Sequence, residues 1–301
     1  GVGFQEVILN ISNDQSEAKM VLWADIDNDG DQDFLVTNRN ASNKIWRNDG
    51  NMQFSDISDI SGISTQDDTK SYGASFGDYN NDGFLDLYIC NYHTYVDFST
   101  NELYQNNGDG TFINVTVLAG VGNGLQQSFQ STFIDIDQDG HLDLHVINDR
   151  LDNLNVFYKN NGDGTFFDMS NMWSVNLGIY AMSSSFGDYD RDGDMDLYVT
   201  NALPGNSLMR NDLNISGNFV DITIQEGVVV SQICWGASWF DHNNDTWPDL
   251  YVASGTSAYT EIPNVFDDYG YQPNQFFVNQ GSSPMTNASS STPDIDQFSF
   301  A

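Results

Sequence analysis

Clusters of aspartate and asparagine recur along the chain at a spacing that could bind a cation. Five windows of nine residues share the pattern Asp-x-Asp/Asn-x-Asp-Gly-x-x-Asp, except that Thr246 replaces the glycine in the last window. We call them loops 1 to 5, and they begin at Asp25, Asp78, Asp135, Asp188 and Asp241. In a tight loop, alternate side chains at positions 1, 3 and 5 converge on one point, and position 9 adds another carboxylate. The pattern therefore predicts a cluster of hard oxygen atoms in each loop.

Calcium suits this arrangement because it takes about six to eight oxygen ligands. Position 7 can offer its backbone carbonyl, and position 6 needs the sharp turn that glycine allows. Magnesium is less suited because it retains waters and rarely uses all-protein cages. We predict five Ca²⁺ sites, with loop 5 the weakest match. The predicted ligands are Asp25, Asp27, Asp29, Asp31 and Asp33; Asp78, Asn80, Asp82, Phe84 and Asp86; Asp135, Asp137, Asp139, His141 and Asp143; Asp188, Asp190, Asp192, Asp194 and Asp196; and Asp241, Asn243, Asp245, Trp247 and Asp249.

Two observations separate this prediction from its alternatives. Aspartate, asparagine and glycine also form ordinary turns, but a turn does not need four converging oxygens in every copy. The first six positions match an EF-hand loop, which requires glutamate at position 12. Position 12 is instead an apolar residue of a predicted strand: Val36, Ile89, Val146, Val199 and Val252. Each loop is therefore expected to join two strands and not two helices.

The residues around the loops repeat as well. An alternating apolar stretch, typical of a strand, follows each loop. The turn sequence Asn-Asn-Gly-Asp-Gly-Thr-Phe occurs in the second and third copies. In the second copy these signals predict strands at about 71–77, 86–91, 102–106 and 111–116. An aromatic residue two positions before each loop is expected to fill the core between neighbouring units: Trp23, Phe76, Phe133, Phe186 and Trp239.

Four short strands in each unit of about 40–55 residues are typical of a propeller blade. The predicted fold is one all-β domain over residues 1–301, a β-propeller of four-stranded blades. Five blades are visible, at about 18–58, 71–116, 128–170, 181–223 and 234–280. They form either a ring, closed by an outer strand from residues 1–9 or 297–300, or part of a larger propeller. Residues 281–295 are rich in Ser, Thr, Asn and Pro and are predicted to be a loop or linker.

The composition excludes several classes of protein. With 43 acidic and 9 basic residues the net charge is −34, so the chain would repel nucleic acids and anionic membranes. Aromatic residues make up 13%, which argues against an acidic disordered chain. The sequence contains no apolar run long enough to span a membrane. Cys90 and Cys234 are too few for a disulfide framework and are expected to be buried free thiols.

The repeated motif resembles the FG-GAP/VCBS repeats, in the style of cartilage acidic protein and ASPIC/UnbV repeats. The resemblance rests on residues 76–89 with 103–112, and on 186–199 with 158–166 before them. It implies a calcium-stabilised propeller, usually of about seven blades, in a secreted or surface protein. It also implies roles in adhesion, in a matrix or in association with carbohydrates. Five repeats are visible in this sequence.

We expect an adhesion, matrix or structural module at the cell surface or outside the cell, and not an enzyme. The histidines suggest no catalytic set with a serine or cysteine nucleophile: His93, His141, His145 and His242. Two insertions, at 92–100 and 255–273, carry aromatic residues that would suit a protein or glycan ligand. These residues are Tyr92, His93, Tyr95, Phe98, Tyr259, Phe266, Tyr269 and Tyr271. The same aromatic residues could instead cap the edges of the blades.

The alternative function is a carbohydrate-binding lectin or a polysaccharide-active enzyme on the same scaffold, and the module could be one unit of a larger assembly. Asn-x-Ser/Thr sequons offer candidate glycosylation sites at Asn10, Asn40, Asn114, Asn214 and Asn287. A further sequon at Asn244 lies inside loop 5 and is a poor acceptor there. Secretion also suits weak calcium sites, because these fill only where calcium is millimolar.

Overall fold

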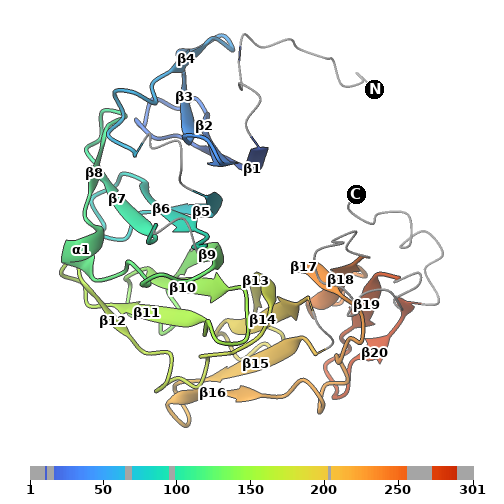
Figure 1. The fold of residues 1–301 in the computed structure, drawn as a ribbon. Coiled ribbons are helices and arrows are strands. Elements are labelled where there is room, and N and C mark those ends of the chain that lie inside the picture. Colours follow the sequence, from blue (N-terminus) through green and yellow to red (C-terminus); the bar gives the residue numbers. More distant parts are fainter. Residues whose placement is uncertain are drawn as a thin grey trace, which may run out of the picture. The chain divides into compact units, whose positions relative to one another are not determined.

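The computed structural model describes residue 11 and residues 17–64, 70–94, 99–202, 205–255 and 273–289. In these residues twenty strands form five four-stranded antiparallel sheets, each built from four consecutive strands (Figure 1). The only helix in this part of the chain is α1 (Thr116–Ala119), and no described helix is long and apolar enough to cross a membrane. The prediction of an all-β chain of four-stranded blades is confirmed.

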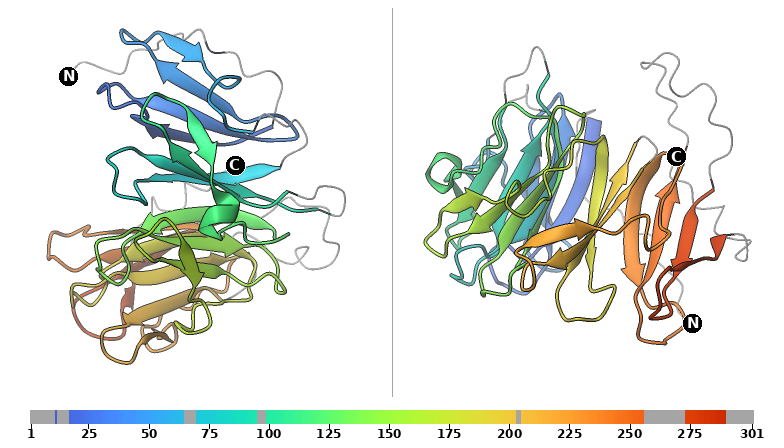
Figure 2. Two further views of the ribbon diagram at one scale, coloured as in Figure 1. Left: turned by 90° about the vertical axis from the view of Figure 1, so that its left-hand side faces the viewer. Right: turned by 90° about the horizontal axis from the view of Figure 1, so that it is seen from below.

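The chain divides into two compact units, of which the first comprises residues 1–133 and 160–167. Its first two sheets have the strand orders β1-β2-β3-β4 and β5-β6-β7-β8. Each sheet is a meander in which strands consecutive in the sequence pair in antiparallel order (Figure 2). The strands are β1 (Glu17–Ala24), β2 (Asp33–Arg39), β3 (Lys44–Asn48), β4 (Phe54–Asp56), β5 (Ser71–Gly77), β6 (Asp86–Asn91), β7 (Glu102–Asn106) and β8 (Phe112–Asn114).

The second unit comprises residues 134–159 and 168–301 and contains the fourth and fifth sheets. Their strands are β13 (Ala181–Gly187), β14 (Asp196–Asn201), β15 (Ser207–Asp212), β16 (Asn218–Asp221), β17 (Cys234–Phe240), β18 (Asp249–Ser254), β19 (Gln275–Val278) and β20 (Thr286–Asn287). The third sheet contains β9 (Ser128–Ile134), β10 (Asp143–Asn148), β11 (Val156–Asn160) and β12 (Phe166–Asp168).

The second strand of each sheet is the centre of the apolar core. All six residues of β6, β10 and β14 are buried, which explains why their sequences carry apolar side chains beside small polar ones. In the first unit Leu35 packs in one cluster with Leu87 and Ile89 of the next sheet. In the second unit Leu208 packs in one cluster with Leu250 of the next sheet. Burial between neighbouring sheets therefore holds the repeats together within each unit.

A glycine at the end of a first strand lets an aromatic residue of the next sheet pack closely. A Cβ atom on Gly77 would lie 2.7 Å from the ring of Phe133, and one on Gly187 would lie 2.6 Å from the ring of Trp239. The aromatic residues before these loops therefore pack between sheets, as expected from the repeat. Trp23 differs, because it is 52% exposed and contacts aromatic rings of its own sheet.

The fifth sheet corrects two expectations about the end of the chain. Its fourth strand, β20, pairs with β19 and lies inside the segment 281–295 that was expected to be a loop. The fifth repeat therefore continues beyond residue 280, to residue 287. Met285, just before β20, is 5% exposed and packs in the core, and this burial anchors a strand too short to show alternation. Residues 1–9 and 297–300, the two candidates for that strand, lie outside the described residues.

A buried asparagine ends the third strand and joins its sheet to the preceding one. The Asn106 amide group donates to the carbonyl oxygens of Ile26 (2.8 Å) and Leu85 (3.0 Å) and accepts from the Gly108 N–H (2.8 Å). Ile26 belongs to loop 1, so this contact runs from the second sheet to the first. The same donation to the preceding acidic loop recurs for Asn160 with Tyr79 (2.7 Å), Asn211 with Ile136 (3.2 Å) and Asn279 with Tyr189 (2.6 Å).

Replacement of this asparagine should destabilise the fold. Asn106→Ala leaves the buried carbonyl oxygens of Ile26 and Leu85 without their donor, which costs about 1–3 kcal/mol. Asn107 is a matched control, since it is exposed and its side chain donates only to the Thr111 hydroxyl (2.9 Å). Asn107→Ala should therefore change the free energy of unfolding by less than about 0.5 kcal/mol. Urea unfolding followed by tryptophan fluorescence measures both, and equal losses would contradict the role of the buried amide.

Candidate metal sites

Each acidic loop joins the first strand of a sheet to the second. The residue before the loop pairs across the hairpin with the aspartate at position 9, as in Gly77 with Asp86 and Gly187 with Asp196. The loop is thus the closed end of a β-hairpin. Its first and last acidic residues are held in place by two neighbouring strands.

Hydrogen bonds from the backbone fold each loop around its own carboxylates. In loop 2 the Asp78 carboxylate accepts from the N–H groups of Asp82 (3.0 Å) and Gly83 (2.9 Å). Asp82 in turn accepts from the Phe84 N–H (3.0 Å). Asn81 at position 4 and Gly83 at position 6 have φ of 58° and 90°, so both lie in the left-handed region. Equivalent contacts to position 1 occur in loops 1, 3 and 5.

The aspartate at position 9 is fully buried in every loop. The Asp86 carboxylate accepts from the backbone N–H of Tyr79 (3.3 Å) in its own loop and of Asn106 (2.8 Å) on the third strand. Burial raises the pKa of Asp86 to about 7 and that of Asp196 to about 8, because a buried carboxylate loses its hydration. A nearby cation would compensate this buried negative charge.

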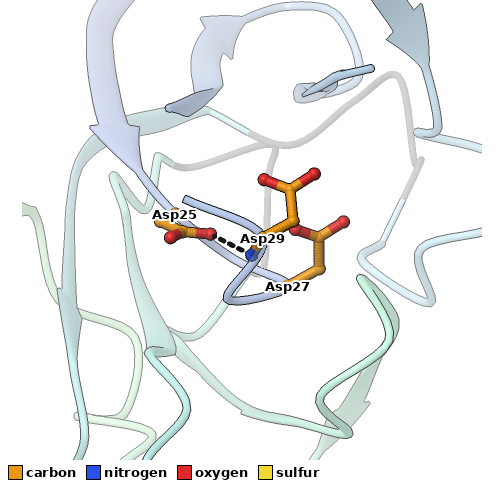
Figure 3. A group of neighbouring side chains, drawn as sticks. All are labelled: Asp25, Asp27 and Asp29. Carbon is orange, nitrogen blue, oxygen red and sulfur yellow. Dashed lines mark hydrogen bonds between the residues drawn. The ribbon is translucent and has the colours of Figure 1, made fainter. Parts of the chain in front are cut away.

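Carboxylate oxygens converge in three of the loops. Oxygen atoms lie within 4.8 Å of one another in the sets Asp25, Asp27 and Asp29 (Figure 3); Asp135, Asp137 and Asp143; and Asp188, Asp190 and Asp196. Buried Oδ1 atoms without a hydrogen-bond partner occur at Asp27, Asp137, Asp188 and Asp194. Burial and then the neighbouring carboxylates raise the pKa of Asp27 and of Asp190. A bound cation would relieve the repulsion between these carboxylates and would take their unpaired oxygens as ligands. The loops therefore fit a metal ion.

Loops 2 and 5 differ because asparagine occupies position 3. The side-chain amide of Asn80 donates to Asp82 (2.9 Å), and that of Asn243 donates to Asp245 (2.9 Å). Each of these loops therefore has one carboxylate fewer and an internal donor in its place. Position 7 also varies, since the Phe84 ring packs against Gly108 and the Trp247 ring packs on the turn glycine of its own sheet.

Neighbouring loops contact each other through position 4, which the sequence analysis did not single out. The Asn28 amide donates to the carbonyl of Gly83 (2.9 Å), and the Gln138 amide donates to the carbonyl of Gly193 (2.6 Å). The Arg191 guanidinium lies over the Trp247 ring at 5.0 Å. Each contact runs from one loop to the loop of the next sheet within the same unit. The only sequence signal was a polar residue with an N–H donor at position 4 in all five copies.

Two of the four histidines, His145 and His242, have defined side-chain contacts. His145 is fully buried against the rings of Phe157 (5.0 Å) and Phe186 (5.6 Å), and burial lowers its pKa to about 3. His242, at position 2 of loop 5, places Nδ1 at 2.5 Å from an Asp249 oxygen. His145 is therefore neutral near pH 7.

The aromatic residues proposed for partner binding are only partly described. The rings of Tyr92 and Tyr72 contact each other at a tilt (centroids 4.8 Å apart), and the Tyr72 ring contacts that of Phe129 in the next sheet (5.2 Å). The His93 N–H donates to the carbonyl of Gln126 (2.9 Å). For Tyr92 these contacts favour the capping alternative. Tyr95, Phe98, Tyr259, Phe266, Tyr269 and Tyr271 lie outside the described residues.

The candidate glycosylation residues lie on the surface where the structure describes them. Asn40, Asn114, Asn214 and Asn287 are exposed, and Asn10 lies outside the described residues. The Asn114 Oδ1 accepts hydrogen bonds from the backbone and hydroxyl of Thr116 (3.1 and 2.7 Å). Access to a glycan is therefore open at four of the five predicted asparagines.

Comparison with known proteins identifies the repeat. A family model described as FG-GAP-like repeat matches residues 25–89, 94–146 and 135–199. No curated protein matches the sequence. Among solved structures, the Vibrio cholerae biofilm matrix protein Bap1 is similar, with 17% identity and a TM-score of 0.51 over 93% of this chain and 40% of that one. The chain thus spans about two fifths of the length of Bap1, and the likeness concerns the fold.

Two further structures show weaker likeness. BBS1N in complex with ARL6DN has 11% identity and a TM-score of 0.45 over 91% of this chain and 78% of that one. The Photorhabdus luminescens Tc holotoxin pore has 16% identity and a TM-score of 0.37 over 88% of this chain and 11% of that one. Neither adds to the assignment of the fold.

Loop 5 carries backbone strain that a single substitution should relieve. Thr246 has φ of 75°, where the other loops have glycine, and a β-branched residue there costs about 1–3 kcal/mol. Glycine itself lowers the free energy of unfolding by about 0.5–1 kcal/mol, because it gives the unfolded chain more conformational freedom. Thr246→Gly should therefore raise the free energy of unfolding by about 1 kcal/mol, measured by urea unfolding in chelator.

The reverse change in loop 2 is its control. Gly83 has φ of 90°, and a Cβ atom there would meet nothing within 4 Å, so Gly83→Thr tests backbone strain without a steric clash. It should lower the free energy of unfolding by about 1–3 kcal/mol. A loss of stability in Thr246→Gly would show that loop 5 tolerates threonine without strain.

Proposed function

Because this chain belongs to the FG-GAP-like repeat family, we propose that it is a calcium-stabilised repeat module that acts outside the cell, in adhesion or in a matrix. The observation that carries the proposal is one loop geometry repeated from sheet to sheet. In loops 1, 3 and 4 three carboxylate oxygens lie within 4.8 Å of one another. Four loops fix position 1 through the same backbone N–H groups.

Calcium bound in a loop would supply the positive charge that the clustered carboxylates lack. Position 1 follows the first strand and position 9 begins the second, so ligation of both would tie the two strands together. In the second sheet, Asp86 also accepts from Asn106, whose amide reaches Ile26 of loop 1. Stiffening of one loop would therefore extend to the neighbouring sheet.

Several features favour calcium and an extracellular setting. The ligands are hard oxygen atoms supplied almost entirely by protein, which suits calcium better than magnesium. Sites with Kd of ~10⁻⁴–10⁻³ M are typical of extracellular modules and fill only at millimolar calcium. The fold likeness to a biofilm matrix protein supports a matrix role. The net charge of −34 gives a strongly acidic chain that attracts cations.

We propose a protein or glycan ligand for the module, and not a substrate that it turns over. The acids that could act as catalytic pairs are engaged by backbone N–H groups within the loops, as at Asp78 and Asp86. His145 is buried and neutral. These arrangements favour a rigid scaffold over acid–base catalysis.

Thermal unfolding in calcium and in chelator tests the metal role. A site with Kd of ~10⁻⁴ M adds about 1.4 kcal/mol at ~1 mM calcium, so several sites should raise the unfolding temperature by many degrees. Magnesium should raise it far less. Asp82→Asn removes a carboxylate from loop 2 and should reduce the calcium-induced rise. Asp59→Asn, the same change at an exposed aspartate outside the loops, should not.

Identical unfolding curves in calcium and chelator would refute the calcium role. A glycan array and a panel of immobilised polysaccharides and matrix proteins, probed with and without calcium, then test the module role. Calcium-dependent retention without shortened products supports a binding module. Release of shortened polysaccharide would instead identify an enzyme.

A further inference from the structure

The residue before the buried asparagine of the third strand differs in charge from sheet to sheet. In order along the chain it is Arg47, Gln105, Lys159, Arg210 and Val278. Three of the five are basic, in a chain that has only 9 basic residues among 301. In the first, second, fourth and fifth sheets, the backbone N–H of this asparagine donates to the position 9 aspartate of the same sheet. The residue before the asparagine therefore lies near the acidic loop of its own sheet.

In the first and fourth sheets, this basic residue is bound by an acid two residues further on. The Arg47 guanidinium lies 2.7 and 2.8 Å from an oxygen of Asp49. The Arg210 guanidinium donates to both oxygens of Asp212, at 2.7 and 2.8 Å. Each guanidinium is therefore held on its turn by two nitrogen contacts, which in Arg210 form a bidentate pair. In loops 1 and 4 the carboxylates at positions 3 and 5 therefore take no part in these ion pairs.

The third sheet lacks that acid, and its basic residue enters the loop instead. Two residues after Lys159 stands Asn161, whose amide donates to the Thr165 hydroxyl (3.0 Å). The Lys159 ammonium contacts Asp137 Oδ2 in a short ion pair and lies 2.7 Å from Asp139 Oδ2. The side chains of Lys159 and Asp137 are 26% and 22% exposed, so the pair is partly shielded from water.

The two acids are positions 3 and 5 of loop 3, the residues expected to ligate a cation. The other oxygen of Asp139 already accepts from the His141 N–H (3.0 Å), which leaves Oδ2 as the oxygen available to a cation. The ammonium therefore sits on oxygens that calcium would need. A divalent ion and an ammonium group a few ångströms apart repel each other strongly in a partly buried site.

We propose that Lys159 is a built-in cation of loop 3, which holds the loop in shape without calcium and competes with calcium for Asp137 and Asp139. The inference rests on the proposed calcium binding by the loops. Calcium binding to loop 3 requires the lysine side chain to swing outward, which its partial exposure permits. Loop 3 is therefore the weakest of the four loops that have glycine at position 6, and its repeat depends least on calcium for its shape.

The test is an exchange of side chains between the second and third sheets. Lys159→Gln gives the third sheet the residue of the second, and Gln105→Lys gives the second sheet the residue of the third. The exchange is matched at the turn, because Asn107 and Asn161 occupy the same position and neither can hold the lysine. The loops differ at position 3, where loop 2 has Asn80, so a lysine at position 105 would pair with Asp82 alone. Arg47→Gln is the control, since that guanidinium pairs with Asp49 outside the loop.

Besides the weak match in loop 5, calcium titration by calorimetry should find one further site in the wild-type chain that is at least about tenfold weaker than the tight sites. Lys159→Gln should raise that site to the affinity of the others, Gln105→Lys should weaken one tight site, and Arg47→Gln should change none by more than about twofold. Asp135→Ala identifies the site, because it should remove no tight site from the wild-type chain but one from Lys159→Gln.

Thermal unfolding provides a second readout that a purely structural lysine would not produce. Lys159→Gln should unfold at a lower temperature than wild type in chelator and at an equal or higher temperature in millimolar calcium. The inference alone would be overturned if Lys159→Gln lowered the unfolding temperature both in chelator and in calcium. It would also be overturned if the wild-type sites were uniformly tight and Lys159→Gln left their calcium affinity unchanged. Absence of calcium binding in every variant would overturn the proposed function together with it.

Discussion

The aspartate at position 9 connects each acidic loop to its sheet. Asp86 begins the second strand, pairs with Gly77 across the hairpin and is fully buried. Its two oxygens accept from Tyr79 in the loop and from Asn106 on the third strand. A buried carboxylate is costly unless it is hydrogen-bonded and its charge is balanced, so the geometry of three elements follows from satisfying this one anion. The candidate cation site is thus part of the sheet and is not confined to an exposed turn.

The buried asparagine extends this arrangement from one sheet to the next. Asn106 donates backward to Ile26, and its equivalents repeat the contact in the third, fourth and fifth sheets. A neutral amide can offer two donors and one acceptor at once, and each is used at this position. An aspartate there would present only acceptors to carbonyl oxygens, which explains why asparagine recurs in a chain otherwise rich in acid.

Local patterns were sufficient to predict most strands, because each motif carries its own physical cause. The second sheet was expected at 71–77, 86–91, 102–106 and 111–116, and its strands lie at 71–77, 86–91, 102–106 and 112–114. β20 escaped prediction because a two-residue strand has no alternation, and only the burial of Met285 fixes it. The Lys159 contact escaped because its cause is the missing acid at residue 161. The missing acid can be recognised only when the equivalent turn position is compared in all the sheets.

In the second sheet, the aromatic residue and the glycine before the loop contact opposite neighbours. Phe76 packs against the cluster that contains Ala24 of the preceding sheet, while Gly77 receives the ring of Phe133 from the following one. In this repeat one dipeptide thus contributes to both of the surfaces that meet the neighbouring repeats, and Phe186-Gly187 recurs at the same place in the fourth sheet. Tandem duplication of a single repeat in the gene would create a neighbour that already fits. Arrays of this kind can therefore gain or lose whole repeats without a new interface having to arise.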